Sequence, residues 1–362
     1  MSGPGPDLHV RGVLLPDGEH RDLWVHDGAV TVERVLGAET VATGWVLPGL
    51  VDLHCHVGLD ADGAVPDVVA ERQAVTDRDA GVLLIRDAGS PADTRWMDDR
   101  DDLPRIVRAG RHLARTRRYI RNYGHEIEPD ELVSYVEQEA ARGDGWVKLV
   151  GDWIDRDLGI LGPCWPAPVL QAAIARAHEL GARVTAHVFG DLALPDLLAA
   201  GIDCIEHGTG LSPELSAELA RRGVPVVPTL VNIQNFPGYA AAGEARYPAY
   251  AAQMRDLHAR RYDTVRTAYE SGVPIYVGTD AGGVLPHGLA AREVLELVRA
   301  GLPPERAVGA GSWDARAFLL GGSGGLAQGA PADLVVVADD PRKTPETLLE
   351  PLRVVLRGRV VR

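Results

Sequence analysis

Two histidines separated by one residue end a short apolar stretch near the start of the chain. Residues 47–57 read L-P-G-L-V-D-L-H-C-H-V, which contains His54 and His56. Because side chains alternate between the two faces of a strand, both imidazoles project the same way and Cys55 projects the other way. Two imidazoles at the carboxyl end of a buried strand could bind one metal ion. The pair alone does not distinguish a metal site from two incidental histidines.

Four further polar residues lie at the ends of other apolar stretches. Each has an ordinary explanation by itself, since a lone histidine is usually a hydrogen-bonded core residue and an aspartate can cap the next segment. Convergence of all of them on one edge of a parallel sheet is harder to explain in that way. Four histidines and a carboxylate are ligands of first-row transition metals, with zinc as the default. The candidate metal ligands are His54, His56, Lys148, His187, His207 and Asp280.

Lys148 differs from the other candidates because an ammonium group cannot bind a cation. It could be a structural lysine paired with Asp152 or Asp155. Alternatively, burial lowers the pKa of the lysine, and the neutral amine takes up carbon dioxide, supplied as bicarbonate, to become a carbamate. That carbamate could bridge two divalent metal ions about 3.5–4 Å apart, with a hydroxide held between them. We expect this hydroxide to attack the substrate and Asp280 to shuttle the proton to a leaving amine.

The stretches that carry these residues alternate with helical patterns across the middle of the chain. Helices are expected over 129–142, 166–180 and 212–222, with proline near each start and glycine after each end. Eight strand–helix units fit a (β/α)8 TIM-like barrel over residues 48–325, which places its site at the carboxyl ends of the strands. A doubly wound open sheet is the alternative, but no G-x-G-x-x-G follows the first strand. The expected strands are Leu50–Val57, Val82–Asp87, Arg105–Ala109, Trp146–Val150, Val184–Val188, Asp203–His207, Val224–Leu230 and Pro274–Asp280.

Both ends of the chain read as short strands joined by turns. Residues 8–47 contain Asp-Gly pairs at 17–18 and 27–28, which are hairpin signals, and residues 333–361 contain two more apolar, β-branched runs. We therefore expect an α/β protein in which residues 1–47 and 326–362 together form a small β-sandwich domain beside the barrel.

Composition narrows the classes of function and partner. The chain has 51 Asp and Glu against 37 Lys and Arg, a net charge of -14, which argues against nucleic acid or an anionic membrane as a partner. The first residues lack the features of a signal peptide, and no apolar run has the length of a membrane span. Three cysteines without C-x-x-C spacing are typical of free thiols in the cytoplasm. We expect a cytoplasmic protein that acts on a small-molecule substrate, while a homo-oligomeric state is left open.

The motifs around the candidate ligands resemble those of the metal-dependent amidohydrolase superfamily. R-D-A-G-S at 86–90, Arg111 and Gly124-His125 are similar to its imidazolonepropionase-like branch, which includes Xaa-Pro dipeptidases (prolidases) and arginine carboxypeptidases. In those peptidases a carboxylated lysine on strand four bridges two zinc ions, and Lys148 occupies that position. The superfamily motifs cover nearly the whole chain: L-P-G-L-V-D-L-H-C-H at 47–56, V-K-L at 147–149, H-V-F-G at 187–190, G-I-D-C-I-E-H-G-T at 201–209, V-G-T-D-A-G at 277–282 and G-A-P-A-D-L-V-V-V-A-D-D-P at 329–341.

The resemblance implies a metal-dependent hydrolase that cleaves an amide or peptide C–N bond in a small substrate, such as a dipeptide or an N-acyl amino acid. One alternative is a mononuclear deaminase or cyclic-amidine hydrolase, in which Lys148 would be structural. Another alternative is a lactone or carbamate hydrolase, because the same metal ions could support either reaction. A non-catalytic relative is disfavoured, because all six ligand positions are filled.

Basic and aromatic residues crowd the loop after the third strand, where the branch usually has a glycine-rich loop. We expect Arg121, Tyr123 and His125 to bind substrate there, with arginine clamping a carboxylate, although such basic residues are often merely solvated. His287, after the eighth strand, is a further substrate-binding candidate. Asn232, Gln234 and Asn235, after the seventh, could hydrogen-bond an amide or cap a turn. The remaining histidines are assigned to surface or packing: His9, His20, His26, His112, His178 and His258.

Overall fold

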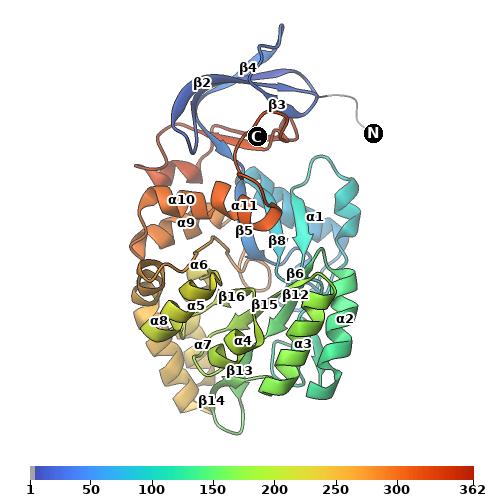
Figure 1. Ribbon diagram of the computed structural model, residues 1–362, viewed down its shortest axis with the longest axis vertical. Helices are drawn as coiled ribbons and strands as arrows, with labels where there is room; N and C mark the ends of the chain where they lie inside the picture. The colour runs from blue at the N-terminus through green and yellow to red at the C-terminus, as the bar shows by residue number, and fades with distance from the viewer. Residues whose placement is uncertain (1–4) are drawn as a thin grey trace.

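The computed structural model describes residues 5–362, which form an α/β body capped at one end by a separate sheet (Figure 1). The strands of the body are parallel and form two sheets, with the orders β5-β8-β9 and β11-β10-β12-β15-β16-β17. β9 and β10 follow one another along the chain, so the second sheet continues the first. The strands are β5 (Leu50–Cys55), β8 (Val82–Asp87), β9 (Arg105–Arg108), β10 (Leu113–Arg115), β11 (His125–Ile127), β12 (Trp146–Val150), β15 (Arg183–Val188), β16 (Cys204–His207) and β17 (Val226–Val227).

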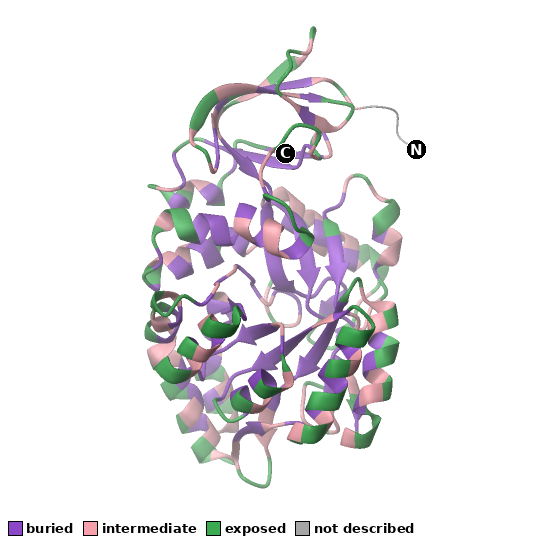
Figure 2. Ribbon diagram, viewed as in Figure 1, coloured by how far each residue is buried: buried purple, intermediate pink, exposed green. Residues whose placement is uncertain are grey.

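Helices surround these strands, and their ends follow the local sequence. The side chain of Ser212 accepts a hydrogen bond from the Leu215 N–H at the start of α5, and Gly223 ends that helix with a φ of 68°. The strands are buried on both faces, as parallel strands covered by helices are (Figure 2). The helices are α1 (Asp67–Asp79), α2 (Leu132–Arg142), α3 (Ala167–Glu179), α4 (Leu194–Ala200), α5 (Pro213–Arg222), α6 (Leu230–Ile233), α7 (Phe236–Gly243), α8 (Pro248–Glu270), α9 (Ala290–Arg299), α10 (Pro304–Ala310) and α11 (Trp313–Leu320).

The last two expected strands differ from the sequence prediction. Strand seven is cut to β17, because Thr229 has a left-handed φ of 49° and α6 begins directly after it. The stretch 274–280 is not a regular strand; it makes one bridge from Ile275 to Val226, and a second bridge joins Ala281 to Cys55. A Cβ at Gly278 would lie 2.7 Å from the Cβ of His54, so glycine is needed for this close approach to β5. The (β/α)8 barrel is completed here by backbone hydrogen bonds without a regular ladder: the N–H of Leu53 donates to the carbonyl oxygen of Val277, that of Thr279 to His54, and that of Val226 to Pro274.

A seven-stranded sheet is built from both ends of the chain, as the sequence suggests. Its order is β20-β19-β18-β4-β1-β2-β3, so β4 lies between an N-terminal and a C-terminal neighbour. Residues 1–4 of the expected terminal domain lie outside the described residues, and its boundaries stay a prediction. The strands are β1 (Leu8–Leu14), β2 (Glu19–His26), β3 (Ala29–Thr31), β4 (Glu39–Pro48), β18 (Leu334–Val337), β19 (Arg353–Leu356) and β20 (Arg359–Val360).

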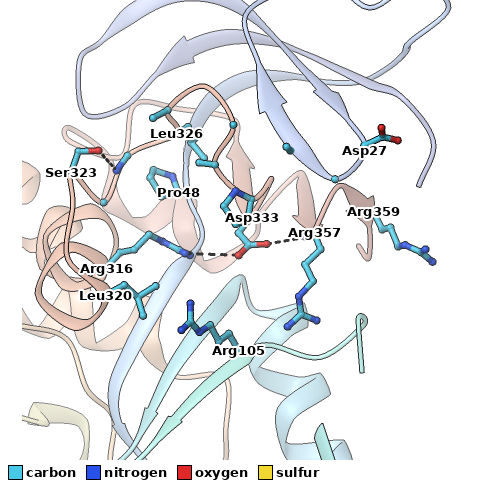
Figure 3. Close-up of a pocket in the computed structure, with 18 of the residues that line it drawn as sticks. Asp27, Pro48, Arg105, Arg316, Leu320, Ser323, Leu326, Asp333, Arg357 and Arg359 are labelled. Atoms are coloured by element: carbon cyan, nitrogen blue, oxygen red, sulfur yellow. Dashed lines mark hydrogen bonds and ion pairs between the residues drawn. The ribbon is translucent and has the colours of Figure 1, made fainter. Parts of the chain in front are cut away.

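A cleft of about 930 Å³ lies between this sheet and the barrel (Figure 3). Arg105, at the start of β9, and Arg316, on α11, enter it from the barrel side. Asp333 lies opposite, 3.8 Å from Arg316, and accepts a hydrogen bond from the backbone N–H of Arg357. The cleft therefore marks the amino end of the barrel strands, away from the histidines. Within residues 5–362, no helix combines the length and apolar character that crossing a membrane would require.

Candidate metal centre

Three of the candidate ligands meet at the carboxyl end of β5. Asp280 Oδ1 lies 2.9 Å from His56 Nε2 and 3.1 Å from His54 Nε2. His56 is fixed from its other side by a 2.7 Å hydrogen bond between Nδ1 and the carbonyl oxygen of Gly89. Both imidazoles of the H-x-H pair therefore present Nε2 to the same carboxylate oxygen.

The other three candidates join the same cluster from β12, β15 and β16. The Lys148 Nζ lies 3.5 Å from His54 Nε2, and His207 Nε2 lies 3.0 Å from His187 Nδ1. The rings of His54 and His207 are 4.9 Å apart between centroids. His54, His207 and Asp280 also offer ligand atoms that all lie within 4.8 Å of one another. The six residues named from the sequence thus form one connected group.

The donor atoms of this group fit a metal ion. His187 Nε2 is buried without a hydrogen-bond partner, and the nearest carboxylate oxygen, from Asp152, is 4.0 Å away. Buried imidazole nitrogens are normally satisfied, so an unpartnered one beside other ligands is consistent with a place for a cation. Nitrogen and carboxylate ligands at four strand ends match the donor set of a divalent transition metal.

Lys148 is fully buried and has no acidic partner. Among residues 5–362, no carboxylate oxygen lies within 4.0 Å of its amine. The two acids considered from the sequence are engaged elsewhere: Asp155 pairs with Arg118 at 2.8 Å, and Asp152 accepts hydrogen bonds from the N–H groups of residues 189 and 190. Burial lowers the pKa of Lys148, while the charges of Glu206 and Asp280 oppose this shift. The structural ion pair is therefore the weaker interpretation.

A buried acid supports the cluster from behind. Glu206, on β16, lies 2.7 Å from His54 Nδ1, which leaves His54 Nε2 facing Asp280. The same carboxylate contacts Arg86 and accepts a hydrogen bond from the hydroxyl of Thr185. Arg86 and Glu206 are both fully buried. Such a carboxylate behind a ligating histidine orients the ring and selects its tautomer.

Backbone strain gathers at the same place. Three non-glycine residues with left-handed φ values, His207 at 66°, Thr229 at 49° and Asp280 at 60°, lie in or beside the cluster. The Thr229 hydroxyl is 2.7 Å from His207 Nδ1. Strained non-glycine conformations persist only where surrounding contacts hold them, and they are frequent at functional sites.

Asp280 is held by a second set of contacts from α6. Its Oδ2 accepts a 2.6 Å hydrogen bond from the Asn232 side-chain amide. The start of α6 is fixed in turn by Glu293, whose carboxylate accepts from the backbone N–H groups of Leu230 and Val231. Burial raises the pKa of Glu293 to about 8, although these two hydrogen bonds oppose the shift. The orientation of Asp280 thus depends on a buried acid that is not itself at the centre.

A pocket of about 300 Å³ opens onto the centre, with His56, His187 and Asp280 in its lining. This volume is at the low end for small-molecule sites. Most of the wall is aromatic and comes from the segments that follow β10, β12, β15 and β17, with Tyr239 on α7 and Tyr250 on α8. The other lining residues are Tyr119, Ile120, Tyr123, Trp153, Phe189, Asn232, Tyr239, Ala242, Tyr250, Gly282, Gly283 and Val284.

Of the four substrate-binding candidates from the sequence, the structure brings only Tyr123 to this pocket. Arg121 is exposed and does not line it. His125 turns away, because its Nε2 pairs with Glu139 on α2 at 2.9 Å. His287 is held behind β5 by Asp77, at 2.7 Å, and is buried there. His125 and His287 are thus each held away from the pocket by a buried carboxylate, that of Glu139 and that of Asp77 respectively.

Several residues of the site were missed by the sequence interpretation. Trp153 and Phe189 each follow a strand that carries a candidate ligand, so their position after the strand was an available signal. His112, assigned to surface or packing, is buried, with ring centroids 5.0 Å from His56 and 5.2 Å from Tyr119. Burial lowers the pKa of His112 well below its usual value, so this ring packs as a neutral group behind His56.

Comparison with known proteins gives a consistent result. The model of a family described as the amidohydrolase family matches residues 45–361. Uncharacterised proteins of Mycobacterium tuberculosis and Mycobacterium bovis are 56% identical over 354 residues, which cover 97% of this chain and 95% of theirs.

Two solved structures show that proteins with much lower sequence identity to this chain share its fold. A Xaa-Pro dipeptidase with bound methionine has a TM-score of 0.82 at 21% identity, covering 98% of this chain and 99% of its own. A structure described as a putative prolidase from Bifidobacterium longum has a TM-score of 0.80 at 22% identity, covering 99% of this chain and 95% of its own.

Proposed function

Because the chain belongs to the amidohydrolase family and is a hydrolase acting on carbon–nitrogen bonds, we propose that it cleaves the amide bond of a small substrate at a centre for two divalent metal ions. Zinc is the expected metal. Lys148, once carboxylated by carbon dioxide, would be one of the groups that hold the ions. The proposed ligands are His54, His56, Lys148, His187, His207 and Asp280.

The observation that carries this proposal is the buried amine of Lys148 among five potential ligands, with no acid of residues 5–362 within ion-pair distance. Lys148 and Lys343 are the only lysines of the sequence, and the other 35 of its 37 basic residues are arginine. Arginine would hold a buried positive charge better than lysine does, but it cannot form a carbamate. Nearly all basic positions of this chain are arginine, yet position 148, where the proposal requires a neutral amine, is lysine.

The residues of this chain supply positioning and proton transfer. When bound, divalent metal ions supply Lewis-acid activation of water and of the substrate carbonyl. Asp280 lines the pocket and is 20% exposed, so its carboxylate can accept the proton of the attacking water and deliver it to the leaving nitrogen. The Asn232 amide holds Asp280 Oδ2 during this transfer. The C–N bond is replaced by a C–O bond, and no redox partner is required.

The fold resemblance supports the same reaction class. The solved structures similar to this chain include a Xaa-Pro dipeptidase, which is 21% identical to it in sequence. The name of that enzyme describes cleavage of an amide bond. Dipeptides and N-acyl amino acids were the substrates expected from the sequence. That expectation came from the family resemblance; the carboxylate clamp expected separately at Arg121 and His125 does not support it, because both residues lie outside the pocket lining.

The carboxylated lysine can be tested directly, because the chain has only two lysines. We expect about two metal ions per chain by elemental analysis of protein purified without chelator, and a ¹³C carbamate signal by NMR after incubation with zinc and ¹³C-bicarbonate. Lys148→Ala should lose the signal and part of the metal. Lys343→Ala, at an 82% exposed side chain, is the matched control and should keep both.

The outcomes separate the alternatives. One metal per chain in both the parent and Lys148→Ala, without a carbamate signal, would favour the mononuclear deaminase or cyclic-amidine hydrolase. No metal, even after zinc and bicarbonate are added, would mean that the six residues do not form a metal centre.

A further inference from the structure

The pocket above the candidate centre is lined by aromatic rings. Trp153 contacts Tyr119 at 4.9 Å between ring centroids, and Phe189 lies 4.2 Å from the ring of His187. Tyr119 and Trp153 also lie within 5.5 Å of His187, at 5.5 and 5.4 Å. One of the candidate ligands is therefore enclosed on three sides by large, mostly apolar side chains.

No lysine or arginine lines this pocket within the part of the chain that the structure describes. The arginines of the neighbouring loop are used elsewhere. Arg118 pairs with Asp155 and donates to the carbonyl oxygen of Gly162, and Arg111 donates to the carbonyl oxygen of Tyr123. Arg121 is exposed. A substrate carboxylate placed in the pocket would thus find no fixed cation in its walls.

The polar groups that do line the pocket are neutral, apart from the candidate ligands themselves. Asn232 Oδ1 accepts a 3.3 Å hydrogen bond from the Tyr239 hydroxyl, and the Tyr123 hydroxyl faces the backbone of Gly283. Asp280, at the base of the pocket, is one of the proposed metal ligands. A substrate carboxylate that lies against these walls, away from the metal centre that holds the scissile carbonyl, leaves water at a large unfavourable free energy, because aromatic faces are electron-rich and no cationic side chain of the walls neutralises the charge.

We propose, on the basis of the function proposed above, that the substrates are small uncharged amides with an aromatic group, and that carboxylate-bearing dipeptides and N-acyl amino acids are excluded. The pocket of about 300 Å³ has the size for a compound with one aromatic ring. Water adds a hydroxyl group to the acyl carbon and a proton to the nitrogen, so the products are a carboxylic acid and an amine. The acid ionises, and the same walls that exclude a carboxylate substrate favour its release.

Binding and turnover are best measured separately, with pairs of compounds that differ only in a carboxylate. For turnover, the pair is acetanilide and 4-acetamidobenzoate. For binding, the pair is phenylacetone and 4-(2-oxopropyl)benzoate, ketones in which a CH2 group replaces the NH and which therefore cannot be cleaved. Calorimetric titration of the zinc- and bicarbonate-treated protein should show the neutral ketone binding at least about tenfold more tightly, a difference of about 1.4 kcal/mol.

An engineered cation provides the complementary test. Ile120→Arg places a guanidinium group on the pocket wall and should raise the affinity for the carboxylate ketone at least about tenfold. Val68→Arg adds the same charge at an exposed position of α1 that does not line the pocket, and should leave the preference unchanged.

The possible results have distinct meanings. A neutral preference in binding without turnover of either anilide would retain the substrate class and refute the amide hydrolysis. Turnover of both anilides with equal or reversed binding preference would refute the substrate class and retain the hydrolysis. If neither ketone binds, or if Ile120→Arg and Val68→Arg change the preference equally, the pocket does not select substrates by charge and the inference is wrong.

Discussion

Replacement of Glu206 by glutamine should affect both the stability of the chain and its affinity for metal. Arg86 and Glu206 are both fully buried, and the guanidinium group of Arg86 lies 4.6 Å above the ring centroid of Trp146. Although burial acts to raise the pKa of Glu206, Arg86 and His54 hold it well below its usual value, so the residue is ionised. The substitution leaves the buried charge of Arg86 unpaired.

The expected size of the effect follows from this burial. Removing one partner of a buried ion pair typically costs about 3–5 kcal/mol, because the remaining charge keeps its desolvation penalty. Glu206→Gln should therefore lower the free energy of unfolding of the metal-free protein by about that amount. The variant also loses the carboxylate at 2.7 Å from His54 Nδ1, and loss of such support typically weakens metal affinity about 10–100-fold.

A double-mutant cycle measures the coupling. Urea denaturation of the metal-free parent, Glu206→Gln, Arg86→Met and the double variant gives the four free energies. We expect the double variant to be about 1–3 kcal/mol more stable than the sum of the single effects predicts, because it leaves no unpaired charge. Additivity within about 0.5 kcal/mol would refute the argument that the two residues neutralise one another. Unchanged zinc affinity of Glu206→Gln in a chelator competition would refute the role of Glu206 in orienting His54.

Two further predictions concern the support of Asp280. Asn232→Ala removes the 2.6 Å hydrogen bond to Asp280 and should lower kcat about 10–100-fold with little change in bound metal. Initial rates and elemental analysis measure the two effects. A loss of metal as large as the loss of rate would assign Asn232 to the metal centre instead. Burial raises the pKa of Glu293 to about 8 from a usual value of 4.5, so the folded chain holds a proton that the unfolded chain has lost, and stability should fall as the pH rises from about 5 to 8. Glu293→Gln should flatten this dependence in urea titrations at several pH values, and an unchanged slope would contradict the assignment.

The fold and the gathering of the six candidate ligands could be predicted because they depend on short-range patterns. Apolar runs that alternate with helical segments specify a parallel barrel, and a polar residue at the end of a buried strand can only lie at one edge of it. β8 and β12 have the predicted bounds, and α5 occupies the helical part of the predicted segment. Strand seven and the stretch 274–280 could not be predicted in this way, because Thr229 and Asp280 adopt left-handed backbones held by contacts with distant residues.

Three of the four substrate-binding candidates lie away from the pocket for a related reason. A flexible basic side chain binds whichever acid the fold places nearby, and the partner can be remote in sequence. His287 pairs with Asp77, which lies 210 positions earlier, and Arg118 pairs with Asp155 from the hairpin after β12. The aromatic pocket wall is likewise assembled from several loops, none of which has a distinctive pattern by itself.

The position of β4 has a consequence for synthesis of the chain on the ribosome. β4 leads through Gly49 directly into β5, which carries His54, yet one of its two neighbours, β18, begins about 290 residues later. At a translation rate of about 5–20 residues per second, that edge of β4 stays unpaired for roughly 15 to 60 s. Exposed edge strands recruit other chains. The nascent protein thus passes through a period in which its N-terminal strands are prone to misassociation, and this period ends only when residues 334–337 have left the ribosome.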